Sequence, residues 1–477
     1  MEDKNREFMQ SFRLRRPSFL HLRRVLAAGL ALVAVAAPAA AQAQKRSVSL
    51  IRDAEIEQLL RDYAAPIFKA AGINARGTRI ILINDRAFNA FVADGKSIFV
   101  NIGVLMDAAT PNEVIGVLAH ESGHLAGGHL ARLRQEMQNA QILSIAGLLV
   151  GVGGAVVGSR SGGSSIGNPG IGAMGAIAGP QELVRRSLLA YQRSEEQAAD
   201  RAAVRFLAAA GQSAKGMLTV FRRFAENSAF LSQAIDPYTI SHPMPSERIA
   251  QLETLAKQAP NFDRLDPPAL QARHDLMRAK LMGFVERESG VARRYGMADQ
   301  SMAARYARAI SDYRSGRMAQ ALAAIDRLIG EQPRNAYFFE LKGQALLEAG
   351  RAREAVPVLR QAVSLAPQAG LIRQMLGHAL QQTGDRALLD EAIRELSNAA
   401  TREPDSADAY QHLSNAYAAK GNIAMAELSA AQYALATGNW TVAHTQASRA
   451  LAKLPQGSPA ALRARDIVEY VPPDKQR

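Results

Sequence analysis

A 34-residue spacing in the C-terminal part of the chain constrains its fold more than any other feature. Pro333 and Pro367 lie 34 residues apart, and Gly or Ala occupies matching positions ahead of each proline. Small residues let paired helices approach closely, and a proline ends each second helix. The pattern therefore predicts an α-solenoid of stacked helix pairs. The matching positions are Ala309, Gly316 and Ala321 in the first unit, Gly343, Gly350, Ala355 and Ala362 in the second, and Gly377, Gly384, Ala392 and Ala399 in the third, with Tyr417, Gly421 and Ala426 in a fourth.

Two irregularities interrupt this period. The third unit, which ends at Pro404, carries about three extra residues around 386–389, and the register later shifts by half a unit towards Gly438. A helix–turn–helix period of 34 residues resembles the tetratricopeptide repeat, although an irregular α-solenoid of another type would share these features. We expect the repeats to span residues 301–470 and to offer a concave groove that binds helices or extended segments.

Length and composition narrow the chemistry of the rest of the chain. The 477 residues are too many for one ordinary domain, so a second domain is expected ahead of the repeats. The chain has no cysteine, so any metal site must use His, Asp and Glu. The net charge is +13, but the Lys and Arg residues form no run with interleaved aromatics. Nucleic acid is therefore not an expected partner, whereas peripheral contact with an anionic membrane surface is plausible.

The first 43 residues have the layout of a secretory signal peptide. Five arginines within 13–24 precede an apolar run at 25–37, and a stretch of small residues follows. The apolar run is short for a membrane span, so we expect cleavage after Ala41 or Ala43; an uncleaved anchor is the alternative. The N-terminus thus predicts an exported protein.

Residues 44–260 are expected to form the second domain, in which a small β-sheet lies beside helices. An amphipathic helix is predicted over 52–71, and strands are predicted over 78–84 and 96–101. Thr110, followed by proline and by a glutamate three residues after the cap, predicts the start of a helix that runs to about residue 137.

A Gly-rich, nearly uncharged segment follows over 139–181. Within it, residues 140–158 are formally long enough to cross a membrane, although Gly is dense throughout. Three interpretations stay open: a mobile lid or hairpin beside the active site, a hairpin that dips into the membrane, and a disordered linker. Later helices are predicted over 182–210, 214–227 and 268–288, the last within a helical linker, 261–300, that leads to the repeats.

The motif that carries chemistry is HExxH, at residues 120–124. On a helix, His120 and His124 lie one turn apart on the same face, where two imidazoles can hold one Zn²⁺. Glu121 would then lie beside the water bound to zinc, take its proton and deliver it to the leaving amine. This spacing predicts a metallopeptidase with one zinc per chain.

A catalytic zinc needs a third protein ligand and one open position. His129 lies five residues after His124, which is about 500° of rotation on a continuous helix, so its side chain would point away from the metal. We therefore expect His129 on the surface or in a groove. A glutamate on a second helix, Glu195 or Glu196, can complete the site. Asp200, one turn further on, can accept the free N–H of a ligand histidine.

With these motifs the chain resembles the M48 family of zinc metallopeptidases. That family pairs HExxH with a downstream ExxAD-type helix, and Glu196 and Asp200 match this second motif in order. The resemblance implies a zincin-like fold that is mainly α with a small sheet. It also implies zinc on His120, His124 and Glu196, with Glu121 as the catalytic residue.

Two further segments resemble the same family. The strand 98–101 looks like the one ahead of the zinc helix, and we expect it to be an edge that pairs with an extended peptide substrate. His242 and Arg248 match the family's HPxxxxR segment. His242 is either a fourth, inhibitory zinc ligand or a loop histidine satisfied by a turn. Arg248 either pairs with Asp200, which is favoured, or binds substrate carbonyls.

The order of signal peptide, catalytic domain and C-terminal repeats resembles the periplasmic β-barrel assembly-enhancing proteases within M48. This resemblance implies a periplasmic endopeptidase that degrades misfolded or stalled outer-membrane proteins. The repeats would bind these clients or the outer-membrane assembly machinery. The alternatives are a chaperone or assembly adaptor with latent or incidental peptidase activity, and a membrane-embedded M48 protease, for which only 140–158 supplies an apolar stretch.

Overall fold

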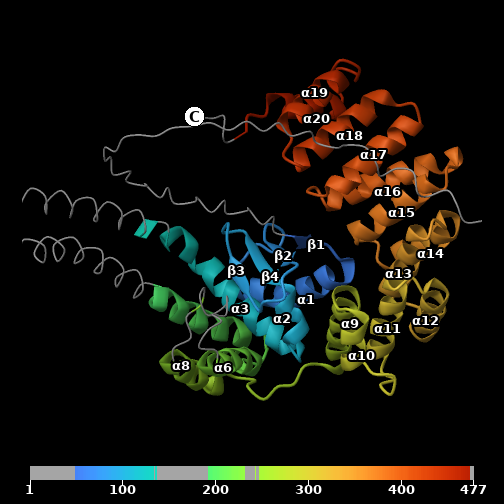
Figure 1. Cartoon of the computed structure of the whole chain (residues 1–477). Coiled ribbons are helices and arrows are strands. Elements are labelled where there is room, and N and C mark those ends of the chain that lie inside the picture. Colours follow the sequence, from blue (N-terminus) through green and yellow to red (C-terminus); the bar gives the residue numbers. More distant parts are fainter. Residues whose placement is uncertain (1–48, 134, 137–191, 231–241, 243–245, 473–477) are drawn as a thin grey trace, which may run out of the picture. The chain divides into compact units, whose positions relative to one another are not determined.

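The computed structural model describes residues 49–133, 135–136, 192–230, 242 and 246–472 (Figure 1). The predicted signal peptide and the Gly-rich segment 139–181 lie outside the described residues, so their interpretations stay predictions. None of the described helices combines the length and the apolar character that a bilayer crossing requires.

A four-stranded sheet opens the described part of the chain. The strands β1 (Leu50–Ile51), β2 (Arg79–Ile83), β3 (Ala90–Val92) and β4 (Ser97–Asn101) lie in the order β1-β2-β4-β3. β2 and β4 are parallel, whereas β1 and β3 pair antiparallel with their neighbours. The predicted first helix and two strands are therefore confirmed within two residues, because α1 spans Ala54–Ala71.

The prediction that residues 98–101 form a sheet edge is wrong. β3, a three-residue strand, pairs antiparallel with β4, and Phe91 lies opposite Phe99. Gly95, with φ of +73°, lies in the turn that joins β3 to β4, and this turn places β3 along the side of β4 that β2 leaves free. β3 is too short to show an alternating pattern, yet it takes the outer position. The edge next to the candidate site therefore belongs to β3.

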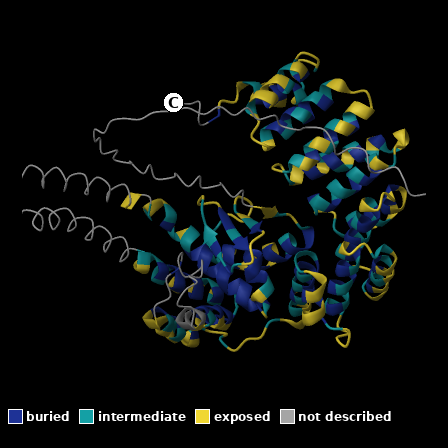
Figure 2. Cartoon of the chain, viewed as in Figure 1, coloured by how far each residue is buried: buried dark blue, intermediate teal, exposed yellow. Residues whose placement is uncertain are grey.

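Helices pack on this sheet and enclose the core of the N-terminal region (Figures 1 and 2). The core draws on α1, the sheet, α3, α6 and α9, and Figure 2 shows its residues as a continuous buried mass. The helices that follow the sheet are α2 (Ile102–Asp107), α3 (Pro111–Gly127), a helix over 192–209, α6 (Lys215–Phe230), α8 (Ser246–Gln258), α9 (Pro268–Val285) and α10 (Glu288–Arg294).

The helix predicted to reach residue 137 ends at Gly127. Gly128 has a left-handed φ of +64°, and its N–H points back to the carbonyls of His124 and Leu125. The chain re-enters helical conformation at residue 129. Because glycine adopts positive φ without steric cost, Gly128 ends the helix within an otherwise helical pattern.

Helix pairs form the C-terminal region, as the 34-residue period predicts. The glycines Gly316, Gly350, Gly384 and Gly421 end first helices of successive pairs with φ between +71° and +81°. The extra residues of the third unit form the 3₁₀ turn η1 (Arg386–Leu388). The helices are α11 (Met302–Arg314), α12 (Met318–Glu331), α13 (Ala336–Glu348), α14 (Ala352–Leu365), α15 (Gly370–Gln382), α16 (Leu389–Arg402), α17 (Ala407–Ala419), α18 (Ile423–Ala436), α19 (Trp440–Leu451) and α20 (Pro459–Glu469).

The half-unit shift after the fourth repeat has a structural reason. α18 packs against both α17 and α19, so it closes one pair and opens the next. Gly438, with φ of +75°, makes the turn between α18 and α19. The last helices therefore continue the same stacking in a new register.

Candidate metal centre

α3 carries HExxH and is buried along almost its whole length. Thr110 accepts a hydrogen bond from the Glu113 N–H, and proline occupies the first turn, so this helix begins where the sequence predicts. Gly123, between the two histidines, lets the helix 192–209 approach closely: a Cβ there would lie 2.9 Å from Cα of Ala199. This contact brings the two predicted metal-binding helices together.

Four donor groups converge between α3, the helix 192–209 and residue 242. Suitable ligand atoms of His120, His124, Glu196 and His242 all lie within 4.8 Å of one another. The Nε2 atoms of His120 and His124 are 3.1 Å apart. The carboxylate of Glu196 lies 3.4 Å from Nε2 of His120 and 3.3 Å from Nε2 of His124. Glu195, the other candidate, lies outside this cluster.

His242 supplies a fourth donor. Its Nδ1 lies 3.3 Å from Nε2 of His120 and 3.0 Å from Oε2 of Glu196. Its Nε2 lies 3.2 Å from the carbonyl oxygen of Ala90 on β3. His242 is therefore buried between the metal-binding atoms and the edge strand.

These distances fit a divalent metal ion. Zinc bound to nitrogen and oxygen at 2.0–2.1 Å in a tetrahedron separates its ligand atoms by about 3.3 Å. Five of the six pairs among His120, His124, Glu196 and His242 have donor atoms 3.0 to 3.4 Å apart, and ligand atoms of all four lie within 4.8 Å of one another. Three imidazoles and one carboxylate also form a donor set that suits zinc.

Glu121 points to a polar or charged occupant beside this cluster. Both of its carboxylate oxygens are buried without a hydrogen-bond partner among the described residues. Nε2 of His242 lies 3.5 Å from Oε1 of Glu121. Burial raises the pKa of Glu121. A buried carboxylate without partners is costly, so the geometry fits a group that contacts water or a cation during function.

A buried ion pair supports His120 from behind. Nδ1 of His120 lies 3.0 Å from Oδ1 of Asp200, and Arg248 contacts both oxygens of Asp200 at 2.6 and 2.8 Å. Burial opposes ionisation of Asp200, but the guanidinium of Arg248 and the imidazole of His120 lower its pKa. Against burial, the carboxylates of Asp200 and Glu196 raise the pKa of His120 to about 9. Arg248 is buried in this network, where it also contacts Glu196 at 2.9 Å.

Of the two expected positions for His129, on the surface or in a groove, the surface position is wrong. His129 is 7% exposed, and its Nδ1 lies 2.9 Å from Nδ1 of His124. Its Nε2 lies 2.7 Å from Oε2 of Glu195. The rotation argument assumed a continuous helix, whereas the break at Gly128 turns the chain back towards His124. The Gly127-Gly128 pair was the sequence signal for this break.

The other described histidines lie outside the cluster. His274 is fully buried and not on a helix surface: it contacts the hydroxyl of Tyr63 at 3.0 Å and the carbonyl of Ala108 at 2.9 Å. Burial lowers the pKa of His274 to about 4. In the repeats, the rings of His378 and His412 stack with centroids 4.0 Å apart.

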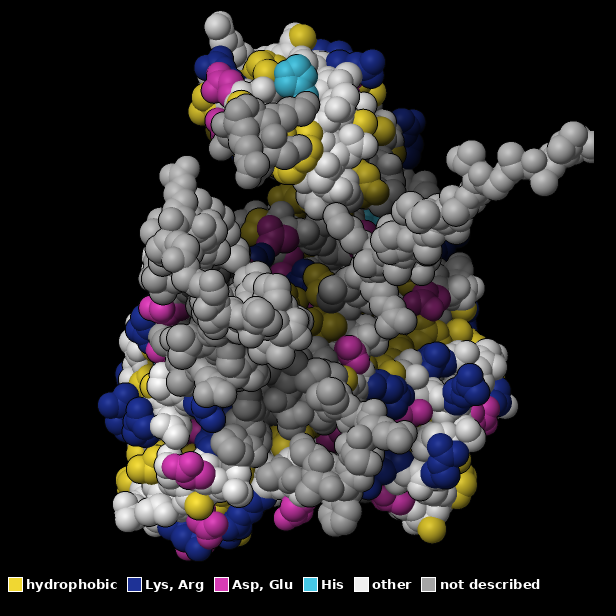
Figure 3. All heavy atoms as spheres, turned by 60° about the vertical axis from the view of Figure 1, so that its left-hand side comes forward, with side chains coloured by type: hydrophobic (Ala, Val, Ile, Leu, Met, Phe, Trp, Pro, Cys, Tyr) yellow, Lys and Arg dark blue, Asp and Glu magenta, His cyan; other side chains and the backbone are white. Residues whose placement is uncertain are grey.

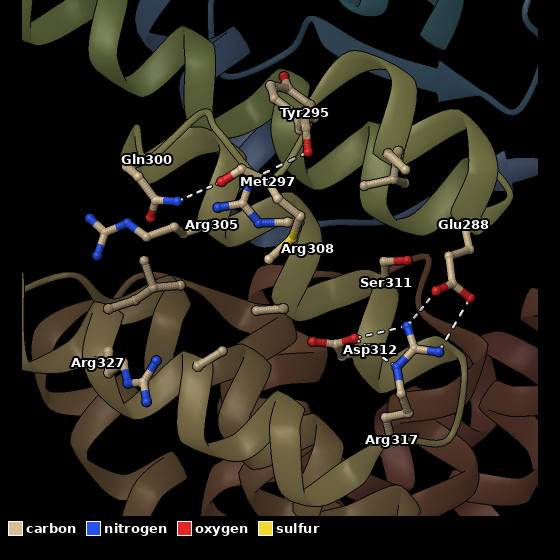
Figure 4. A pocket seen from close by; sticks show the side chains of 15 residues that line it. Glu288, Tyr295, Met297, Gln300, Arg305, Arg308, Ser311, Asp312, Arg317 and Arg327 are labelled. Atoms are coloured by element: carbon tan, nitrogen blue, oxygen red, sulfur yellow. Dashed lines mark hydrogen bonds and ion pairs between the residues drawn. The ribbon is translucent and has the colours of Figure 1, made fainter.

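One cavity in the helical region, of about 410 Å³, lies among α10, α11 and α12 (Figure 4). There, Arg317 pairs with Glu288 and Asp312, while Arg308 donates to the carbonyls of Tyr295 and Gly296.

The second cavity, of about 540 Å³, is a groove along the first helices of the repeat pairs, α13, α15 and α17. Its lining mixes apolar side chains and amides with the stacked His378 and His412 and with six charged residues, Arg52, Asp53, Lys280, Glu340, Glu348 and Asp408. On the face shown in Figure 3, described basic side chains are interspersed with acidic ones.

Comparisons with known proteins match two parts of the chain. A family model described as peptidase family M48 matches residues 50–256, and one described as tetratricopeptide repeat matches residues 336–368. The beta-barrel assembly-enhancing protease of Escherichia coli (strain K12) is 24% identical over 385 residues, which cover 79% of this chain and 74% of the relative. The Yersinia pestis protein of the same name is 23% identical over 414 residues, covering 84% of this chain and 81% of that protein.

Among solved structures, the repeats are similar to YrrB, described as a TPR protein with an unusual peptide-binding site. That match has 21% identity and a TM-score of 0.31, and it covers 37% of this chain and 92% of YrrB.

Proposed function

Residues 50–256 belong to peptidase family M48, and from this premise we propose that the chain is a zinc-dependent endopeptidase of the bacterial cell envelope. The convergence of His120, His124 and Glu196 carries the proposal, because their donor atoms are spaced as zinc ligands are. Residues 44–260 would form the catalytic domain, residues 301–470 the repeat domain, and residues 1–43 a cleaved signal for export to the periplasm.

Each residue of the site has a role in this proposal. His120, His124 and Glu196 would hold the metal, which when bound would supply Lewis-acid polarisation of the scissile carbonyl and a lowered pKa for a water molecule. Glu121, with both oxygens buried and without hydrogen bonds, takes a proton and returns it to the leaving amine. Asp200 orients His120, and Arg248 holds Asp200 in place through two hydrogen bonds.

The edge strand β3 is the place where substrate would bind. An extended peptide can add to the outer side of β3 by backbone hydrogen bonds. At present the Ala90 carbonyl on β3 faces Nε2 of His242 at 3.2 Å. The same imidazole fills the fourth donor position with Nδ1. His242 therefore occupies both the outer side of β3 and the fourth metal position, which a catalytic zinc would leave to water or substrate. The enzyme would be latent until substrate displaces His242.

The first experiment is cleavage of an unfolded protein, casein, by the purified mature chain with and without a chelator, beside Glu121→Gln. We expect chelator-sensitive cleavage that falls by about 10²- to 10⁴-fold in the variant, because the general base is lost. The variant should still bind one zinc per chain. Cleavage that persists in Glu121→Gln would refute the proposed catalytic role.

Latency is tested with His242→Ala. Removing the fourth donor should raise the rate of casein cleavage and weaken zinc binding. The matched control is His444→Ala, on an exposed face of α19, which should change neither quantity. Unchanged activity and unchanged zinc affinity in His242→Ala would show that this histidine is only structural.

The repeats would select the clients. The groove along α13, α15 and α17 suits a polypeptide segment, because it is lined by apolar, amide and charged side chains. The names of the relatives connect those proteins with β-barrel assembly, so we propose that misfolded or stalled outer-membrane proteins are substrates here and that the assembly machinery is a candidate partner. If Glu121→Gln kept the full effect on barrel assembly in cells, the chain would instead act as an adaptor.

A further inference from the structure

The two histidines of HExxH are supported by different partners. His120 faces the carboxylate of Asp200, which is paired with Arg248. His124 faces another imidazole, His129, with the two Nδ1 atoms 2.9 Å apart. His129 in turn reaches Oε2 of Glu195 with its Nε2 at 2.7 Å.

The direction of each hydrogen bond follows from the metal site. Nε2 of His124 faces His120 and Glu196 at 3.1 and 3.3 Å, so this nitrogen is the one available to a metal. Nδ1 of His124 must then carry the hydrogen and donate it to Nδ1 of His129. His129 is left with a hydrogen on Nε2, which it donates to the carboxylate of Glu195. With this assignment, each ring nitrogen of His124 and His129 donates a hydrogen bond, accepts one or faces the metal position.

We infer that His129 is a positioning residue, which holds His124 in the tautomer and ring orientation needed to bind zinc, with Glu195 fixing His129 in the same way. This inference rests on the proposed function. His129 touches neither substrate nor metal, and it acts only through His124.

Two consecutive glycines make this contact possible. On a continuous helix, a residue five positions after His124 would point to the other side. Gly128, with φ of +64°, breaks the helix and turns His129 back. Gly127 leaves room for the ring: a Cβ there would lie 2.2 Å from Nε2 of His129 and 2.4 Å from its Cδ2. The backbone is thus shaped around this one imidazole.

Glu195, the last member of this series of hydrogen bonds, has a second partner. Arg132 contacts Oε2 of Glu195 at 2.7 Å, the same oxygen that accepts from His129. Glu195 is adjacent to the proposed ligand Glu196 on the helix 192–209. These hydrogen bonds therefore connect the segment that follows α3 to the helix that supplies the third ligand.

Zinc affinity is the measurement that tests this inference, because it does not depend on catalysis. The full mature chain is titrated with zinc against a chromophoric chelator, for wild type, His129→Phe and His129→Asn. Phenylalanine keeps a ring in the cavity but accepts no hydrogen bond, so affinity should fall about 10- to 100-fold. The side-chain oxygen of asparagine can accept from His124 in place of Nδ1, so His129→Asn should recover most of the lost affinity. His444→Phe, on an exposed helix face, is the matched control and should bind zinc as wild type does.

A second pair of variants keeps the test decisive if His129→Phe folds poorly, as judged by thermal unfolding of the metal-free protein. Glu195→Leu should weaken zinc binding, whereas Glu195→Gln, whose amide oxygen still accepts, should weaken it less. Equal zinc affinity in wild type, His129→Phe and Glu195→Leu would overturn the inference and leave the proposed function intact. Failure of wild type to bind one zinc per chain would overturn both.

Discussion

The peptidase region and the repeat region bury different kinds of side chain. Around α3, the residues His120, Glu121, Glu196, Asp200 and Arg248 are all at most 3% exposed. In the repeats the buried positions are mostly alanine and leucine, with alanines at the places where paired helices meet. Ion pairs around α3 join residues far apart in sequence, whereas the repeats pack against their neighbours. Both regions have apolar cores, but the first also contains a buried polar network built from distant parts of the sequence, whereas the second depends on repeated local packing.

Removal of the metal should affect the two regions most unequally. Zinc at 1,000 times its dissociation constant stabilises the state that binds it by about 4 kcal/mol. Hydrogen exchange measured with and without a chelator should show lost protection in α3 and the helix 192–209, with α13–α16 unchanged. An equal loss of protection in both regions would mean that they unfold as one unit and would break the comparison.

Matched glycine substitutions should then separate function from packing. In Gly123→Ala, the new Cβ would meet backbone of Ala199, so the two metal-binding helices must move apart and activity should fall about 10²-fold. In Gly343→Ala, the new Cβ would lie 2.3 Å from the Leu359 side chain, which should cost about 1–3 kcal/mol of stability in the repeats. Casein cleavage should fall mainly in Gly123→Ala, whereas the thermal unfolding temperature should fall mainly in Gly343→Ala. Loss of activity in Gly343→Ala at a temperature where it is folded would contradict this separation.

One buried charge cluster joins Glu340 of the repeats to residues that precede the repeats. Lys280 of α9 contacts Asp53, Glu55 and Glu340 at 2.8, 3.3 and 3.4 Å. Burial, only partly offset by Lys280, raises the pKa of Glu340 to about 7. A carboxyl whose pKa is raised on folding adds stability below its unfolded pKa, and this stability is lost as the pH rises towards 7.

Replacement of this glutamate should therefore flatten the pH dependence of stability. As the pH rises from 5 to 8, the free energy of unfolding of Glu340→Gln should increase relative to that of wild type by on the order of 1–2 kcal/mol. Urea unfolding at both pH values measures this difference, with Glu354→Gln on the exposed face of α14 as the control. A pH dependence identical to wild type would place the titration elsewhere in the cluster.

The smallest expected effect is a gain. Gly330 lies in α12, and a Cβ at this position would meet no atom within 4 Å. Gly330→Ala should therefore stabilise the repeats by about 0.5–1 kcal/mol through helix propensity alone. A destabilised Gly330→Ala would show that packing in the repeats extends beyond the small-residue contacts.

Local patterns in the sequence predicted much of this architecture. The cap at Thr110, the HExxH spacing and the 34-residue period each depend on residues a few positions or one repeat apart. Such patterns report directly on helix starts, shared helix faces and stacked pairs. For this reason α1, β2, β4, the start of α3 and the repeat helices could be predicted, as could the candidate donors on α3.

Only the tertiary structure decided what surrounds those donors. The sequence placed the edge at β4, but β3 occupies it, because strand order depends on which strands pair in space. A helix pattern placed His129 on the far side, but Gly128 turns it onto His124. His242 and His120 are 122 residues apart in sequence, yet Nδ1 of His242 lies 3.3 Å from Nε2 of His120. Periodicity shows which face of an element is buried, whereas folding determines which groups meet on that face.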